Sequence, residues 1–290
     1  MSDLFSGIGD RLKAYRLGRN LSPEVVADLI GVSRAALYRY EKGVPPKLET
    51  LEKISEVLEV SLPTLLGVGV EYIASCLSFM ERMRQIESET HHISALFGPI
   101  SYLLTTDTYD TMLHEVLIES LPDEFKRNSE ALNEISTITD ILKERKKNYS
   151  QNKPSILSLV SISELERFIH NGFIGHYNLS DTVKKYREEV ARKEVQNIVN
   201  LLEEQPIGVQ LGVLIDTIPN SNFQIFRQKS KDIVAISPFS LGDLPNIRLG
   251  VAMITNAPDA VKFHSNITNN LWDRSLKGIK AIDYINKNLI

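Results

Sequence analysis

Two short helices joined by a very short turn are the feature of this sequence that most restricts its fold. Ser22 followed by Pro23 is typical of a helix N-terminus, and Gly31 can take the positive φ on which many helices end. A second helix is predicted from Ser33, again a capping residue, to Gly43. Two helices with so short a connection have the layout of a helix-turn-helix unit, which we therefore predict for this segment.

The second helix of this unit has two unlike faces. The inner face carries residues that can pack on the rest of the domain: Val32, Ala36, Leu37 and Tyr40. The outer face carries one small residue and three that can make polar contacts: Arg34, Ala35, Tyr38 and Arg39. A small residue lets a helix lie deep in a groove, and arginine reads guanine through two parallel hydrogen bonds. We therefore predict that this helix reads base edges in the major groove of DNA.

The charge is distributed as such a role requires. Between residues 33 and 47 four basic side chains face the single acidic Glu41, whereas the whole chain carries a formal charge of −4. An acidic protein does not coat nucleic acid non-specifically. A local basic surface, by contrast, can neutralise phosphates along one binding site.

The chain is long enough for a second core beyond this head, by which we mean residues 1–67. A long amphipathic helix is predicted over residues 70–89, and we expect residues 68–90 to connect the head to a domain at 91–290 and to contribute to a dimer interface. After Pro206 the apolar period changes to two, which predicts an antiparallel meander of four strands at 207–216, 222–228, 232–239 and 247–255. The expected fold is an all-α head followed by a larger α/β (α+β) domain that senses an effector and dimerises.

Residues 8–66, which include LSPEVVADLIGVSRAALYRYEKG, resemble the XRE-type (phage-repressor-like) helix-turn-helix family. The resemblance implies a bacterial transcriptional regulator, by analogy a repressor, that binds double-stranded operator DNA as a homodimer or higher even oligomer. It also implies that Glu41 stabilises the fold through a basic residue of the first helix, Arg16 or Arg11. Pro23-Glu24 departs from the family, which often has a DNA-binding glutamine there. The resemblance and the charge pattern together predict these DNA contacts: Ser22, Ser33, Arg34, Ala35, Tyr38, Arg39, Lys42 and Lys47.

The larger domain carries no strong catalytic or metal-binding pattern. The sequence contains no H-E-x-x-H, no phosphate-binding glycine loop and no G-x-S-x-G, and we expect neither an enzyme, nor a metal, nor a cofactor. Mixed polar and aromatic residues near predicted strand ends form our candidate effector site: Phe97, Tyr102, Asp216, Asn222, Gln224, Arg227, Ser237, Phe239 and Arg248. The alternative for each is an ordinary turn, or a surface ion pair in the case of Arg227 and Arg248.

A second resemblance covers the end of the chain. The segments RLGVAMIT and NAPDAVKFHSNITNNLWDRSLKG resemble the closing strand and helix of phospholipase D-like sensor domains, and SETHHISALFGPISYLL resembles their opening elements. Catalytic members carry H-x-K, which this sequence lacks, so the resemblance implies the non-enzymatic, ligand-binding branch. The alternatives are a diverged phosphodiesterase and a module that binds a protein partner, as in antitoxins. With one cysteine, no apolar run of membrane length and no secretory pattern, we expect a cytoplasmic protein without a membrane partner.

Overall fold

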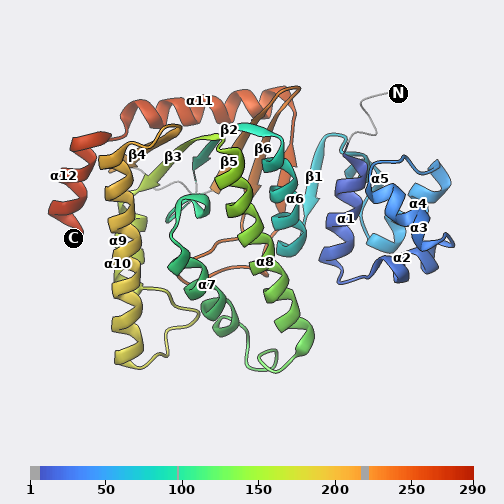
Figure 1. Cartoon of the computed structure of the whole chain (residues 1–290), viewed down its shortest axis with the longest axis horizontal. Coiled ribbons are helices and arrows are strands. Elements are labelled where there is room, and N and C mark those ends of the chain that lie inside the picture. The colour runs from blue at the N-terminus through green and yellow to red at the C-terminus, as the bar shows by residue number, and fades with distance from the viewer. Residues whose placement is uncertain (1–6, 97, 217–221) are drawn as a thin grey trace.

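The computed structural model describes residues 7–96, 98–216 and 222–290. A helical head lies at one end of a larger body, by which we mean residues 68–290, and α1 is the head helix nearest to that body (Figure 1). The described residues of the head, 7–67, form five helices: α1 (Ile8–Gly18), α2 (Pro23–Ile30), α3 (Arg34–Glu41), α4 (Leu48–Leu58) and α5 (Leu62–Leu66).

The predicted helix-turn-helix is formed by α2 and α3. The Ser22 hydroxyl accepts a hydrogen bond from the Val25 amide at 3.3 Å, and the Ser33 hydroxyl accepts one from the Ala36 amide at 3.2 Å. Gly31 ends α2 with a φ of 73°, a conformation that costs glycine nothing. The head core consists of apolar side chains that are almost fully buried, among them Ile8, Leu12, Val26, Leu37, Leu51 and Ile54.

The body is built on one seven-stranded mixed sheet with the strand order β1-β7-β6-β5-β2-β3-β4. Its strands are β1 (Val70–Ile73), β2 (Thr90–Leu96), β3 (Ser155–Ser161), β4 (Val209–Leu214), β5 (Asn222–Gln228), β6 (Asp232–Ser237) and β7 (Ala252–Thr255). Strands β2, β3 and β4 are parallel to one another, and every other pairing in the sheet is antiparallel.

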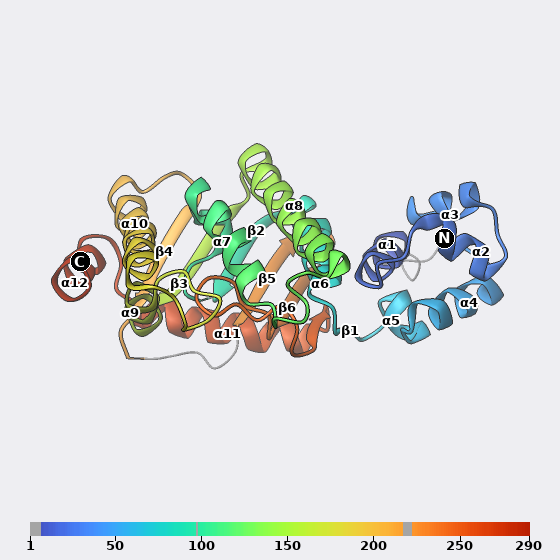
Figure 2. The ribbon, with the colours of Figure 1, turned by 90° about the horizontal axis from the view of Figure 1, so that it is seen from below.

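Helices cover the two faces of the sheet unequally. Most of them lie on one face, and α11 lies across the other (Figure 2). The helices of the body are α6 (Cys76–Ser88), the 3₁₀ turn η2 (Tyr102–Leu104), α7 (Asp107–Glu119), α8 (Ser129–Asn152), α9 (Ile162–Asn171), α10 (Asp181–Glu204), α11 (Pro258–Arg274) and α12 (Gly278–Asn288). The larger hydrophobic core lies under the first group of helices and is continuous with the head core, whereas a smaller core lies under α11. No helix in the described part of the chain is long and apolar enough to cross a membrane.

The predicted helix over 70–89 is wrong at its start. Residues 70–73 form the edge strand β1, which pairs antiparallel with β7, and the helix begins only at Cys76 behind the capping residue Ser75. Moreover, α6 is buried along most of its length between α1 and α8. Since both of its sides are occupied within one chain, α6 does not fit the expected role of a dimer interface.

The predicted four-strand meander contains three strands. Strands β5, β6 and β7 follow one another as antiparallel neighbours, but β4 lies at the far edge of the sheet, parallel to β3. Strand β2, from much earlier in the chain, occupies the place beside β5. Local patterning gives strands and turns but not the order of strands in a sheet, which depends on contacts between distant segments.

Buried polar contacts fasten the head to the body. The guanidinium of Arg82 on α6 makes two hydrogen bonds to the Glu71 carboxylate, at 2.9 and 3.0 Å, and Arg11 on α1 lies 3.6 Å from the same carboxylate. Burial by itself would lower the pKa of Arg82, but Glu71 outweighs that effect and raises it. The Ser78 hydroxyl on α6 also donates to the Ala14 carbonyl of α1 at 3.0 Å. The head is therefore packed against the body rather than tethered to it.

Candidate nucleic-acid interface

Helix α3 presents the surface that the sequence predicts for DNA. Ala36 and Leu37 are buried against the head core, and Val32 and Tyr40 pack partly against it. The eight predicted DNA contacts are all exposed: Ser22, Ser33, Arg34, Ala35, Tyr38, Arg39, Lys42 and Lys47. The body does not cover this surface, because α1 lies between α3 and the body (Figure 1).

Buried Glu41 fixes the far end of α3 to α1. Its carboxylate accepts hydrogen bonds from the Arg16 guanidinium at 2.6 and 3.3 Å, and Arg16 also donates to the Leu21 carbonyl at 2.8 Å. Of the two partners that the resemblance allows for Glu41, Arg16 is the one used. Arg11 instead donates to the carbonyls of Leu65 and Leu66, at 2.8 and 2.9 Å.

Arg34 is held by two neighbours at the start of α3. Its Nε lies 2.6 Å from a Glu24 carboxylate oxygen on α2, and another nitrogen donates to the Tyr38 hydroxyl at 3.1 Å. The guanidinium also lies 5.3 Å from the centre of the Tyr38 ring. All of these contacts are in solvent, where an ion pair is weak and readily exchanged. Arg34 is therefore oriented along the helix, but it can exchange these exposed partners for others.

The remaining basic side chains of the surface extend into solvent. Within the described residues no ion pair involves Arg39, Lys42 or Lys47, so these three charges are available to phosphates or bases. Ser22 and Ser33 differ from them, since their hydroxyls already accept the capping hydrogen bonds. Their contribution to binding would come from holding the helix N-termini, whose exposed amides favour anions.

The candidate effector residues lie on different elements and on both faces of the sheet. Along β5 the side chains alternate between the faces, so Gln224 lies on the α6 side and Arg227 on the α11 side. Arg227 pairs with Asp232 across a hairpin, and Asp216 pairs with Arg274 of α11. Arg227 therefore forms an ion pair, which is the alternative that the sequence left open for it.

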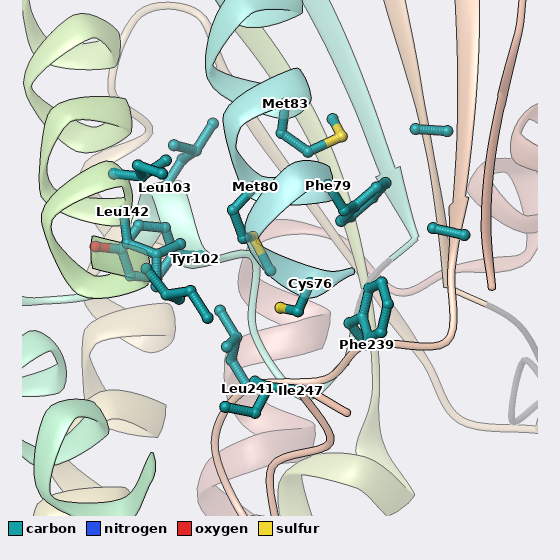
Figure 3. Packing of buried hydrophobic residues seen from close by; sticks show 14 of the residues in the cluster. Cys76, Phe79, Met80, Met83, Tyr102, Leu103, Leu142, Phe239, Leu241 and Ile247 are labelled. Carbon is teal, nitrogen blue, oxygen red and sulfur yellow. The ribbon is translucent and has the colours of Figure 1, made fainter. Parts of the chain in front are cut away.

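Other candidates lie at turns or in the core. The Ser237 hydroxyl is bonded to the backbone of Phe239, as expected for an ordinary turn. Phe239 is fully buried with its ring 5.9 Å from that of Phe79, and Tyr102 is also buried (Figure 3). Asn222 begins β5 and accepts a hydrogen bond from the Gly98 amide at 3.4 Å. The candidate Phe97 lies outside the described residues.

Arg248 is the candidate that the structure places at a hollow. Its guanidinium lies 4.7 Å from the ring centre of Phe125, at the edge of a cleft between the head and the body. Sequence reasoning missed the other residues of this cleft, because they come from four further segments that the fold brings together. It also missed the pairing of Glu24 with Arg34, although Glu24 already departed from the family pattern.

Comparison with known proteins agrees with the geometry of the head. A helix-turn-helix family profile matches residues 12–65. The phage-derived regulator YonR of Bacillus subtilis is 41% identical over 59 residues, which are 20% of this chain and 55% of that protein. The regulator SinR of the same organism is 39% identical over 61 residues, again 20% and 55%. This chain thus spans about half the length of these Bacillus relatives.

One relative is covered more fully. The transcriptional repressor RstR of the cryptic phage CTXphi of Vibrio cholerae is 35% identical over 79 residues, which are 27% of this chain and 69% of that protein. The similarity to all of these relatives is confined to the N-terminal region. A solved structure of the archaeal chromatin protein TrmBL2 is matched over 84% of this chain and 64% of that chain, at 10% identity and a TM-score of 0.35, which assigns no common fold.

Proposed function

Since this chain belongs, through its N-terminal domain, to the XRE family of helix-turn-helix proteins, we propose that it binds operator DNA and regulates transcription. One observation carries the proposal most directly. The inner face of α3 is locked to α1 by the buried pair of Arg16 and Glu41, while its outer face is left exposed. A rigidly held helix with a basic outer face is what major-groove reading requires.

The side chains of that outer face suit different parts of a DNA site. Arg34 and Arg39 can each make two hydrogen bonds to a guanine, and Ala35 lets the helix approach the bases. Lys42 and Lys47 lie beyond α3 and would contact phosphates, which gives affinity that falls as salt rises.

The proposal for the body extends beyond the head. We propose a repressor that binds as a homodimer, with half-sites separated by about one DNA turn, roughly 34 Å. We propose that the body is a sensor rather than an enzyme. It would bind a small-molecule effector, and this binding would change operator affinity. The segments behind the phospholipase D-like resemblance include β2 with η2 and β7 with α11, and all of them belong to the body to which we assign the sensor role. Binding to the chromosome would place the protein in the cytoplasm.

The recognition surface can be tested without a known operator. The full chain is used to select binding sites from random DNA, and the selected site then serves to compare wild type with Arg39→Ala and Arg34→Ala. We expect each substitution to weaken specific binding by roughly 10- to 100-fold. Lys147→Ala is the matched control, because it removes an exposed positive charge on α8 of the body. Selection of no preferred sequence by wild type, or equal binding by the α3 variants, would contradict the proposal.

A further inference from the structure

A cleft of about 340 Å³ lies between the head and the body. The head contributes the end of α1 and the residues that follow it, and the body contributes the start of α6, the segment before α8, the first turns of α8 and the loop between β6 and β7. Its size falls within the range of small-molecule sites in proteins. Because both parts of the molecule form its walls, a ligand bound there would contact the head and the body together.

Opposite charges face each other across this cleft. Arg248 comes from the β6–β7 loop, and Glu130 and Glu134 come from successive turns of α8. In the described chain no ion pair joins Arg248 to either carboxylate, although Arg248 acts electrostatically on Glu134. Burial raises the pKa of the Glu134 carboxyl, Arg248 opposes that rise and Glu130 adds to it. A partly desolvated carboxylate without its own cation favours a ligand that brings a positive charge.

An apolar wall lies between the charges. The Phe125 ring packs under the guanidinium of Arg248, and Ile247 and Ala131 are buried beside it. Figure 3 shows Ile247 next to Leu241, near Cys76 at the start of α6. The N-terminus of α6, with Ser75 as its cap, also lines the cleft and adds a partial positive charge there.

We propose that this cleft binds a small amino-acid-like zwitterion, with its carboxylate toward Arg248 and its ammonium group toward Glu134 and Glu130. A side chain of modest size would lie against Phe125. A neutral or purely anionic metabolite would leave the partly buried carboxylate of Glu134 without a cation, at a cost in free energy. The inference rests on the proposed function in one respect, because it identifies the effector that the regulator would sense.

Because the cleft lies between the head and the body, a ligand bound there could change the orientation of the helix proposed to bind DNA. The Asn20 side chain of the head donates to the Glu130 carboxylate of the body at 3.5 Å, a long and weak contact at the edge of the cleft. An ammonium group that engages Glu130 would compete with Asn20 and alter how the segment after α1 contacts the start of α8. Since α1 carries Arg16, which holds α3 through Glu41, the ligand would bias the orientation of the recognition helix.

The experiment uses the full chain and the proteinogenic amino acids as probes. Each is added singly at millimolar concentration, and the melting temperature of the protein is recorded over a concentration series. We expect at least one amino acid to raise the Tm in proportion to the logarithm of its concentration. Its decarboxylated amine and its N-acetyl derivative should each bind at least about tenfold more weakly, because each loses one charged contact.

Variants identify the site. Arg248→Gln and Glu134→Gln should each weaken the binding of that amino acid by about tenfold or more, whereas Glu144→Gln, near the exposed end of the same helix α8, should leave it unchanged. A single cooperative melting transition of each variant without amino acid shows that it is folded. If no amino acid shifts the Tm, or if the shift survives both cleft variants, the inference is wrong.

The two proposals can fail separately. A protein that selects an operator but binds no amino acid would overturn the zwitterion site and leave the regulator intact. One that binds an amino acid at Arg248 and Glu134 but selects no DNA would support the site and contradict the regulator. If both hold, the amino acid should change operator affinity severalfold, and Asn20→Ala should reduce that change; an unaltered operator affinity would contradict the assignment of the ligand as effector.

Discussion

Glu24 is the residue of the DNA-facing surface whose charge opposes binding. It lies on α2 at the edge of the predicted interface and pairs with Arg34, so that it would both repel phosphate and hold a side chain that we propose to read bases. Glu24→Gln removes the charge and keeps the size of the side chain. We expect the variant to bind the selected operator severalfold more tightly and to retain the stability of wild type, because exposed ion pairs contribute little.

Fluorescence anisotropy with labelled operator at two salt concentrations measures this effect. Glu56→Gln is the control, since it removes the same charge from an exposed position on α4 and no ion pair joins Glu56 to α3 in the described chain. Operator affinity that is unchanged or lower in Glu24→Gln, or that rises equally in both variants, would show that Arg34 is not restrained by Glu24.

At the residue scale the sequence predicted which face of α3 is buried, but it did not decide which arginine pairs with Glu41. The 3.6-residue period alone separated the buried Ala36 and Leu37 from the exposed Arg34 and Arg39, because a helix face depends only on local spacing. The choice between Arg11 and Arg16 as the partner of Glu41 could not be made that way. It depends on α5, whose carbonyls take up the Arg11 guanidinium.

At the scale of elements, β1 shows where patterning fails. Val70 and Ile73 extend the apolar spacing of α6 backward, so the segment resembles one continuous helix. Gly67 and Gly69, both with positive φ, precede it, and Ser75 caps the true helix start. What makes residues 70–73 a strand is β7, which lies far along the chain, and this pairing leaves no local signal. The period of two also separates the candidate effector residues of β5, since it places Gln224 and Arg227 on opposite faces of the sheet.

The contact between α7 and α10 predicts a dependence of stability on pH. Arg187 of α10 makes two hydrogen bonds to the Glu119 carboxylate, at 2.6 and 2.8 Å. Burial would raise the pKa of Glu119, but Arg187 outweighs burial and lowers it below its ordinary value. A carboxyl whose pKa is lower in the folded state stabilises the fold above its unfolded pKa, about 4.3, and loses that contribution as the pH falls further.

Urea unfolding of wild type and Glu119→Gln across the acid range measures this contribution. We expect the variant to be less stable by about 1–2 kcal/mol at neutral pH, with the difference disappearing as the pH falls well below about 4. Glu115→Gln is a matched control, because Glu115 lies one turn earlier on α7, 3.5 Å from the same arginine and half exposed. A difference that persists at low pH would mean that Glu119 acts through packing and not through its charge.

At the scale of the whole molecule, the buried carboxylate of Glu71 joins the head to the body and should make them unfold together. It is only 6% exposed, and it lies between Arg82 of the body and Arg11 of the head. Glu71→Ala would leave two buried guanidinium groups facing each other, a change that typically costs about 3–5 kcal/mol. Lys13→Ala is the control, because it removes a partly exposed lysine at the same junction whose partner, Glu81, keeps its ion pair with Arg84.

Scanning calorimetry distinguishes a jointly folded molecule from two independent parts. We expect wild type and Lys13→Ala to unfold in one transition whose calorimetric and van't Hoff enthalpies agree, and Glu71→Ala to show a separate transition of the head at lower temperature. In wild type the head and body cores are continuous across α1 and α6, so the two parts should unfold together. In Glu71→Ala the buried guanidinium groups lose their partner, which weakens this junction and lets the head unfold first. Two transitions in wild type would mean that the head moves independently of the body, and a ligand between them would then have no fixed orientation of α3 to change.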